Sequence, residues 1–219
     1  MPSNLSLATL LIFIIDVFIS CKAADSRIGG GSDTGGPIDY QVYLRFRSIS
    51  SGAQYEMCTG TLITPEVVLT AAHCQAVDND FEVYFDTYDI TKREDSKRRS
   101  VFDAKTHPQY KEFDLGATRD FQLLLLSEPV PDTIQYILFI DGSPGVDIEI
   151  NEGDALYATG WGITEFEGTT TSDLLQEAEI NADATEQCNE FYSDAGRDLV
   201  GPNEFCTRTA GMFLLLSYL

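Results

Sequence analysis

The sequence predicts an all-β fold, because short runs of alternating apolar and polar residues recur along most of the chain. Phe81–Phe85 and Leu174–Ile180 are two such runs, and clusters of Gly, Pro, Asn and Asp separate the runs from one another. Few helices are expected, and residues 185–192 are the one segment in which a short helical turn is predicted. No internal repeat or linker is visible. The pattern therefore favours an all-β domain of antiparallel strands.

The first 23 residues are predicted to form a signal peptide. Their apolar core runs from Leu7 to Ile19 and is interrupted by Asp16. Cys21-Lys22-Ala23 follows, with small residues at the end of the segment where cleavage is expected. An uncleaved anchor is the alternative, but the apolar run is too short to span a bilayer comfortably. We therefore expect a secreted, extracellular protein with no stable membrane span.

The chain carries a formal net charge of −21 over 219 residues. Removal of the signal peptide takes away Asp16 and Lys22 together, so the mature chain keeps this charge. A strongly acidic surface repels nucleic acid, which we do not expect as a partner. The preferred interpretation is a solvated acidic exterior that favours solubility. Steering of basic partners or substrates toward the protein is the alternative.

Two cysteines bracket the most informative segment of the chain. Cys58 and Cys74 lie 16 positions apart, around an apolar stretch that reads as two short strands joined at residues 64–66. A disulfide between them would close this hairpin and stabilise it by about 3 kcal/mol, because it lowers the entropy of the unfolded chain. The bridge would also anchor His73. One interpretation of His73 is a packed histidine beside an ordinary disulfide, and the alternative, a catalytic histidine, depends on the surrounding residues.

Residues 58–63 read Cys-Thr-Gly-Thr-Leu-Ile, and residues 67–74 read Val-Val-Leu-Thr-Ala-Ala-His-Cys. These two segments resemble the catalytic-histidine segment of chymotrypsin/trypsin-like serine endopeptidases. The resemblance implies a double Greek-key β-barrel. It also implies a triad of a histidine base, an orienting aspartate and a serine nucleophile. On this basis His73 is the general base of a protease that acts on protein or peptide substrates without a cofactor.

Residues 107–110 and 119–126 resemble the family segment that carries the orienting aspartate, which assigns this role to Asp120, 47 residues after His73. A solvated carboxylate at the start of a strand is the alternative. Four consecutive leucines, Leu123–Leu126, are expected to carry Asp120 inward. A buried carboxylate that accepts the imidazole N–H leaves the other ring nitrogen free to act as the base.

Two further conspicuous residues are expected to have structural roles. His107 is followed by a proline, which favours an extended, turn-like backbone, and its surroundings resemble a surface loop of the family. Trp161 is the single tryptophan, and residues 157–162, Tyr-Ala-Thr-Gly-Trp-Gly, resemble a strand of the second barrel. We therefore assign His107 no chemistry and expect Trp161 to be a packing residue.

Arg27-Ile28-Gly29-Gly30 resembles the family's activation site, with Gly29 in place of the usual valine. The resemblance implies that an activating protease cuts after Arg27 and frees Ile28 as a new N-terminus. The predicted domains are the signal peptide at 1–23, a short activation segment at 24–27 and a trypsin-like protease domain at 28–219. Within the last, we expect a first barrel at about 28–126 and a partial second barrel at about 145–211.

Of the five cysteines, Cys21 leaves with the predicted signal peptide, and an even number remains. Pairing between neighbours is the simplest arrangement. Cys58–Cys74 and Cys188–Cys206 both match bridges of the family. An oxidising compartment follows from such a disulfide set.

An acidic stretch, Asp78-Asn79-Asp80 with Glu82, lies where some family members bind calcium. Its spacing is not that of an EF-hand loop. We therefore assign no metal site.

The C-terminal residues depart from the family pattern. Residues 206–211 resemble the approach to the nucleophile loop, after which the family continues Gly-Asp-Ser-Gly-Gly-Pro, whereas residues 212–219 read Met-Phe-Leu-Leu-Leu-Ser-Tyr-Leu. Ser217 has no neighbouring glycines that let the backbone present paired N–H donors. We interpret the sequence as truncated before its nucleophile, with an aberrant apolar tail at 212–219 that has no partner sheet. The chain as written is expected to be inactive.

We favour a secreted serine endopeptidase represented by a truncated sequence. A non-catalytic protease-like binding protein is the alternative function, and a fragment that never accumulates is a third hypothesis. An intact second barrel with only the serine replaced would support the binding protein, and this sequence does not have that form.

Overall fold

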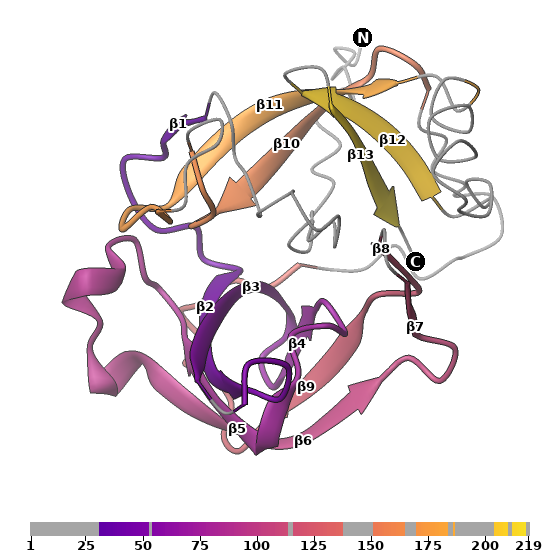
Figure 1. The fold of residues 1–219 in the computed structure, drawn as a ribbon. Coiled ribbons are helices and arrows are strands. Elements are labelled where there is room, and N and C mark those ends of the chain that lie inside the picture. Colours follow the sequence, from indigo (N-terminus) through magenta and orange to yellow (C-terminus); the bar gives the residue numbers. More distant parts are fainter. Residues whose placement is uncertain are drawn as a thin grey trace, which may run out of the picture.

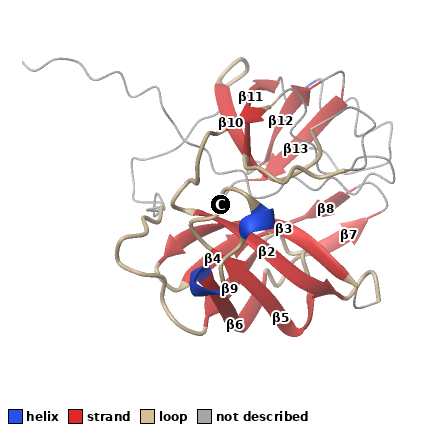
Figure 2. Ribbon diagram, turned by 90° about the vertical axis from the view of Figure 1, so that its left-hand side faces the viewer, coloured by secondary structure: helices blue, strands red, loops and turns tan. Residues whose placement is uncertain are grey.

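The computed structural model describes residues 31–52, 54–113, 116–137, 151–164, 170–183, 186, 204–209 and 212–217. Strands dominate these residues (Figure 2), and two short 3-10 helices, η1 (Ile90–Lys92) and η2 (Asp95–Lys97), interrupt them. The predicted all-β class is confirmed. None of the helices in these segments is long and apolar enough to cross a membrane. The predicted signal peptide and activation site lie outside the described residues, as does the predicted helical turn apart from Glu186.

Six strands close into a barrel, shown in indigo to pink in Figure 1. They pair in the order β2-β3-β4-β9-β6-β5, and every pairing around the ring is antiparallel. After β2, β3 and β4, the chain returns so that β5 pairs with β2, which is the Greek-key arrangement. The strands are β2 (Gln41–Ser48), β3 (Tyr55–Thr64), β4 (Val67–Thr70), β5 (Ala76–Tyr84), β6 (Arg98–Thr106) and β9 (Gln122–Leu126). A separate hairpin, β7 (Lys111–Phe113) with β8 (Gly116–Thr118), lies between β6 and β9 in the chain.

The barrel interior is filled by side chains that alternate along the strands. Val42, Leu44 and Phe46 of β2 are at most 1% exposed, and Leu62 and Val68 are fully buried among them. Burying one such side chain stabilises the fold by about 1.5–3 kcal/mol relative to leaving it exposed. The barrel core is therefore a main source of stability for the loops that leave its ends.

Strand β9 alternates more strictly than its four leucines suggest. Leu124 and Leu126 face the interior at 0% and 4% exposure, whereas Leu123 and Leu125 are 39% and 38% exposed. The expectation that all four leucines would carry Asp120 inward is therefore only half right. In a closed barrel one face of each strand points away from the core, whatever its composition.

The second half of the chain contributes an open five-stranded sheet in the segments that are described. Its central strand, β11, pairs with β10 along most of its length, with β1 at its start and with β12 at its end. The strands are β1 (Ser32–Asp33), β10 (Ala155–Gly160), β11 (Gln176–Asp183), β12 (Glu204–Thr209) and β13 (Met212–Ser217). Figure 1 shows this sheet above the barrel.

Strand β13 corrects the expectation of an apolar tail without a partner. Residues Met212–Ser217 pair with β12 along their full length, from Thr209↔Met212 to Glu204↔Ser217. The segment is uncharged and apolar, and β12 offers it a free edge of N–H and C=O groups. Residues Met212–Ser217 therefore form a strand of the second sheet, paired with β12.

Trp161 is fully buried where the barrel meets the second sheet. Its ring meets that of Tyr43 edge to face, with 5.6 Å between the ring centres, and its Nε1–H donates to the Tyr88 carbonyl at 3.0 Å. Nearby, the Thr159 hydroxyl donates to the Gln41 side-chain oxygen at 2.9 Å. Trp161 thus packs as expected, and together these contacts fasten the sheet to the barrel.

We predict that Gly60→Ala destabilises the barrel by about 1–3 kcal/mol, because the added methyl group overpacks the core. A Cβ at Gly60 would lie 2.6 Å from Cγ1 of Val68 and 3.1 Å from Cγ2 of Val42. Both neighbours are β-branched and have little freedom to move aside. Urea unfolding measures the loss. The control is Gly36→Ala, where nothing lies within 4 Å and a change within about 0.5 kcal/mol is expected; equal effects of the two substitutions would contradict this packing.

Candidate catalytic site

Neighbouring strands β4 and β9 deliver the two candidate catalytic residues to one end of the barrel. Strand β4 ends at Thr70, shortly before His73, and β9 begins at Gln122, just after Asp120. Thr70 is paired directly with Gln122. Because the strands are antiparallel, the chain leaves β4 at the position where it enters β9, so residues distant in sequence meet there.

His73 and Asp120 contact each other through two hydrogen bonds. The backbone N–H of His73 donates to Oδ1 of Asp120 at 2.9 Å, and the ring Nδ1 lies 2.6 Å from Oδ2. The side chains are 21% and 17% exposed. An ionised carboxylate only accepts hydrogen bonds, so the proton of a neutral His73 ring belongs on Nδ1. In this tautomer Nε2 carries the ring lone pair, and it is the nitrogen that can accept a proton.

Gln122 holds the turn that carries His73. Its side-chain amide donates to the carbonyl oxygens of Ala71 at 2.9 Å and Cys74 at 2.8 Å, and the residue is 2% exposed. The Thr70 hydroxyl, also buried, donates to the Thr59 carbonyl at 2.8 Å. Sequence reasoning missed Gln122. Its signal was a polar residue at an inward position of an otherwise apolar strand, two places after Asp120.

A disulfide joins Cys58 of β3 to Cys74, with 6.4 Å between the Cα atoms, and both residues are at most 2% exposed. It therefore ties the residue next to His73 to a third strand. The two sulfurs and a ring nitrogen of His73 lie within 4.8 Å of one another. Bridged sulfurs are not thiolates, which are the form of cysteine that binds metal ions. In this oxidised form the group is therefore not a metal site.

The Tyr110 hydroxyl is buried and has no hydrogen-bond partner among the residues that the structure describes. Burial raises the pKa of Tyr110, and the negative charges of Asp120 and Glu112 raise it further. The phenol therefore stays protonated and neutral beside the carboxylate at neutral pH.

In the described segments, His107 contacts its own turn and Phe121. Its Nδ1 accepts the backbone N–H of Gln109 at 3.1 Å, and its ring centre lies 4.7 Å from that of Phe121. Its own N–H donates to the Phe121 carbonyl at 3.0 Å. These bonds hold the 107–110 turn against the segment that follows Asp120, in keeping with a structural residue.

Of the remaining predicted site residues, the structure describes only Cys206. Arg27, Ile28 and Cys188 lie outside the described residues, so the activation site and the Cys188–Cys206 bridge stay predictions. Cys206 lies in β12, opposite Leu215 of β13.

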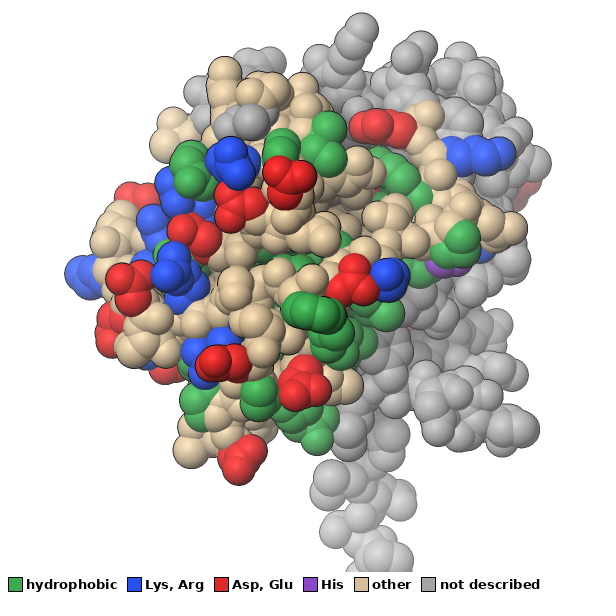
Figure 3. All heavy atoms as spheres, turned by 90° about the horizontal axis from the view of Figure 1, so that it is seen from below, with side chains coloured by type: hydrophobic (Ala, Val, Ile, Leu, Met, Phe, Trp, Pro, Cys, Tyr) green, Lys and Arg blue, Asp and Glu red, His purple; other side chains and the backbone are tan. Residues whose placement is uncertain are grey.

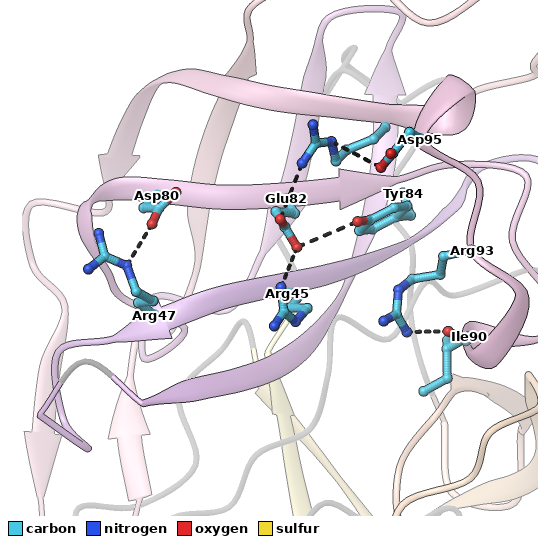
Figure 4. A network of polar contacts seen from close by, with 9 residues as sticks. Arg45, Arg47, Asp80, Glu82, Tyr84, Ile90, Arg93 and Asp95 are labelled. Atoms are coloured by element: carbon cyan, nitrogen blue, oxygen red, sulfur yellow. Dashed lines mark hydrogen bonds and ion pairs between the residues drawn. The ribbon is translucent and has the colours of Figure 1, made fainter.

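The acidic stretch of β5 is already paired with arginines (Figure 4). Asp80 contacts Arg47 at 2.7 Å, and Glu82 contacts Arg45 at 2.7 Å and Arg98 at 3.2 Å. A calcium ion at these carboxylates would have to displace the guanidinium groups. Figure 3, a view from below Figure 1, shows Lys and Arg side chains interspersed with Asp and Glu side chains, so oppositely charged groups lie near one another despite the net negative charge.

The Trypsin family model matches residues 27–212 of this sequence. The chain belongs to the Trypsin family. Chymotrypsin-like elastase family member 1 from Felis catus is 29% identical over 154 residues, which cover 69% of this chain and 56% of that protein. Vitellin-degrading protease from Bombyx mori is 31% identical over 176 residues, covering 77% of this chain and 60% of that protein. The chain thus spans little more than half the length of these curated relatives.

A solved structure described as "Structure of GrC" has the same fold. It superimposes with a TM-score of 0.68 at 24% sequence identity, covering 84% of this chain and 76% of that one. At this identity the likeness concerns the fold alone. Together with the closed barrel, it confirms the predicted trypsin-like architecture, and the second sheet is open in the residues that the structure describes.

For this Trypsin-family chain we predict that Gln122→Leu lowers the free energy of unfolding by about 1–3 kcal/mol, because two buried carbonyls lose their donor. The turn carrying His73 should also loosen, which histidine NMR spectra would report as broadening or loss of the His73 signals. Gln54→Leu is the control, since Gln54 is exposed and its side chain makes no hydrogen bond that the structure shows. An unchanged stability and unchanged His73 signals in Gln122→Leu would contradict the role assigned to this amide.

Proposed function

We propose that this chain supplies the general base and its orienting residue to a secreted serine endopeptidase, which hydrolyses peptide bonds in proteins. The observation that carries the proposal is the double contact of His73 with Asp120 at the end of the barrel. Membership of the Trypsin family supports the same reading.

In this proposal, Nε2 of His73 removes the proton from a serine hydroxyl and later returns it to the leaving amine. Asp120 fixes the ring tautomer and stabilises the imidazolium that forms during the reaction. Positioning is supported by the short 2.6 Å contact and by the second bond from the His73 backbone. Because both bonds end on one carboxylate, the ring and its main chain are oriented together.

The nucleophile is a separate matter. The 219 residues contain no Gly-Asp-Ser-Gly-Gly motif. We therefore propose that the chain as written does not turn over substrate, and that catalysis belongs to a form of the protein that carries such a serine with its oxyanion hole. Substrates are proteins or peptides, in line with the family.

Activation and secretion form the next part of the proposal. Cleavage after Arg27 by an activating protease would free Ile28, and strand β1, which begins at Ser32, is held against β11. The Cys58–Cys74 disulfide is typical of an oxidising compartment, which supports extracellular localisation, and Cys188–Cys206 is proposed as a second bridge.

The test joins residues 27–211 to the nucleophile-bearing remainder of a complete family member, activates the chimera and measures peptide hydrolysis. We expect activity that falls by about 10⁶-fold in His73→Ala and by about 10⁴-fold in Asp120→Asn. His107→Gln is the matched control and should leave kcat unchanged.

The 219-residue chain itself is tested with a fluorophosphonate probe. We expect no covalent labelling, because His73 has no serine to activate. Labelling at Ser217 that is lost in His73→Ala would mean that the chain carries its own nucleophile. A chimera whose activity survives His73→Ala would overturn the role of that residue and favour a non-catalytic, protease-like binding protein.

A further inference from the structure

We propose that reduction of the Cys58–Cys74 disulfide converts the His73 site into a three-ligand binding site for Zn²⁺ or a similar divalent ion. The ligands are the two cysteine thiolates and Nε2 of His73. Two thiolates and one imidazole form a donor set that zinc prefers, and three protein ligands leave a fourth position for water.

One pair of ligand atoms, Nε2 of His73 and Sγ of Cys74, already has the spacing that a metal requires. The two sulfurs and the ring nitrogen all lie within 4.8 Å of one another, and Nε2 of His73 is 3.6 Å from Sγ of Cys74. Tetrahedral zinc, with Zn–S near 2.3 Å and Zn–N near 2.0 Å, separates a nitrogen from a sulfur ligand by about 3.6 Å. His73 and Cys74 therefore need little movement to bind one ion.

The two sulfurs must move apart, because zinc separates two thiolates by about 3.8 Å. The Cα atoms of Cys58 and Cys74 are 6.4 Å apart. Rotation of either side chain about χ1 can open the sulfurs from this backbone spacing. The barrel strand that carries Cys58 and the turn that carries Cys74 can thus stay in place.

The contact with Asp120, which also orients the proposed general base, suits a metal-binding histidine. A histidine that binds a metal almost always donates its other ring N–H to a carboxylate or carbonyl, which fixes the tautomer and makes the ligand more basic. In this structure Nδ1 of His73 lies 2.6 Å from Asp120, so Nε2 is the nitrogen turned toward the sulfurs. The orientation of the ligand is set before any metal arrives.

Charge and access are consistent with an ion at this position. Two thiolates balance the charge of a divalent ion, and the overall charge of −21 attracts cations to the protein. Cys58 and Cys74 are buried, whereas the side chain of His73 is 21% exposed. The ion would therefore enter from the side of the histidine ring, where the fourth position stays open to water.

Metal binding requires reduction of the disulfide, because bridged sulfurs are not thiolates. A phosphine donates two electrons to the disulfide and becomes a phosphine oxide with the oxygen of a water molecule, whose two protons go to the sulfurs of Cys58 and Cys74. A dithiol instead delivers both electrons and both protons and itself becomes a disulfide. Metal binding then releases their two protons. The ion occupies the Nε2 lone pair, so the loaded form has no free base at His73. Binding itself does not depend on the proposed protease function.

The experiment uses the 219-residue chain reduced with a phosphine, which is then removed without oxygen. Zn²⁺ is titrated by calorimetry, and Co²⁺ is added as a spectroscopic substitute. We expect one tightly held ion, with thiolate-to-cobalt charge-transfer bands and the intense visible bands of tetrahedral cobalt, and none of these in the oxidised chain. Asp120→Asn should weaken zinc binding by about 10–100-fold. His73→Gln, which removes a ligand, should weaken it by more than that, and His107→Gln should leave it unchanged.

The variants also separate this site from other cysteines. Cys21, Cys188 and Cys206 are reduced at the same time, and ions held by them would bind equally well in His73→Gln. That result would overturn the proposal, as would cobalt bands in the oxidised chain. If reduction abolishes the near-ultraviolet circular dichroism, Zn²⁺ must restore it in the parent chain and not in His73→Gln; no restoration would also overturn it. The protease proposal is tested on oxidised protein, so the two can fail separately.

Discussion

The antiparallel pairing of β4 with β9 is the constraint on which the candidate site depends. Four residue pairs, from Val67↔Leu125 to Thr70↔Gln122, fix the register of the two strands. A slip by one residue would exchange Leu124 and Leu126 for Leu123 and Leu125, so the leucines alone do not set this register. The buried Gln122 amide distinguishes it, because only this register lets the amide bond the carbonyls of Ala71 and Cys74. Because His73 and Asp120 lie just outside the paired residues Thr70 and Gln122, this register brings them together.

Three further contacts convert proximity into a defined geometry. The disulfide ties Cys74 to β3, the Gln122 amide holds the carbonyls on both sides of His73, and Asp120 binds both the main chain and the ring of that residue. All of these groups come from the closed barrel. Preorganisation of this kind lets a base act without first reorganising its surroundings. The second sheet contributes none of these contacts in the described segments, and it is joined to the barrel around Trp161.

The sequence predicted the parts of the structure that follow from local patterns. Alternating runs predicted the strands, and the segment around Thr70–Cys74 predicted both the disulfide partner and the histidine that lies beside it. Asp120 was assigned from the resemblance of residues 107–110 and 119–126 to the family segment that carries the orienting aspartate. The structure brings His73 and Asp120 within hydrogen-bond distance, and their catalytic roles stay a proposal.

Other features depend on neighbours that a linear sequence does not display. Leu123 and Leu125 look like core residues, but they lie on the outer face of a closed barrel. Arg119 adopts a φ of 52°, a left-handed conformation that the chain reaches just before Asp120 and that residue type alone does not favour. The partner of Met212–Ser217 was unforeseeable because it depended on which edge of the second sheet lay open.

Histidine-selective ¹⁵N NMR of the oxidised chain tests the account most directly, because the sequence has only two histidines. At an alkaline pH at which both rings are neutral, the structure predicts opposite tautomers. His73 should carry its proton on Nδ1, with a downfield, slowly exchanging resonance that disappears in Asp120→Asn. His107, whose Nδ1 accepts the Gln109 N–H, should carry its proton on Nε2. A His73 ring protonated on Nε2, or spectra unaffected by Asp120→Asn, would contradict the central claim that the barrel holds these two residues as a base and its orienting carboxylate.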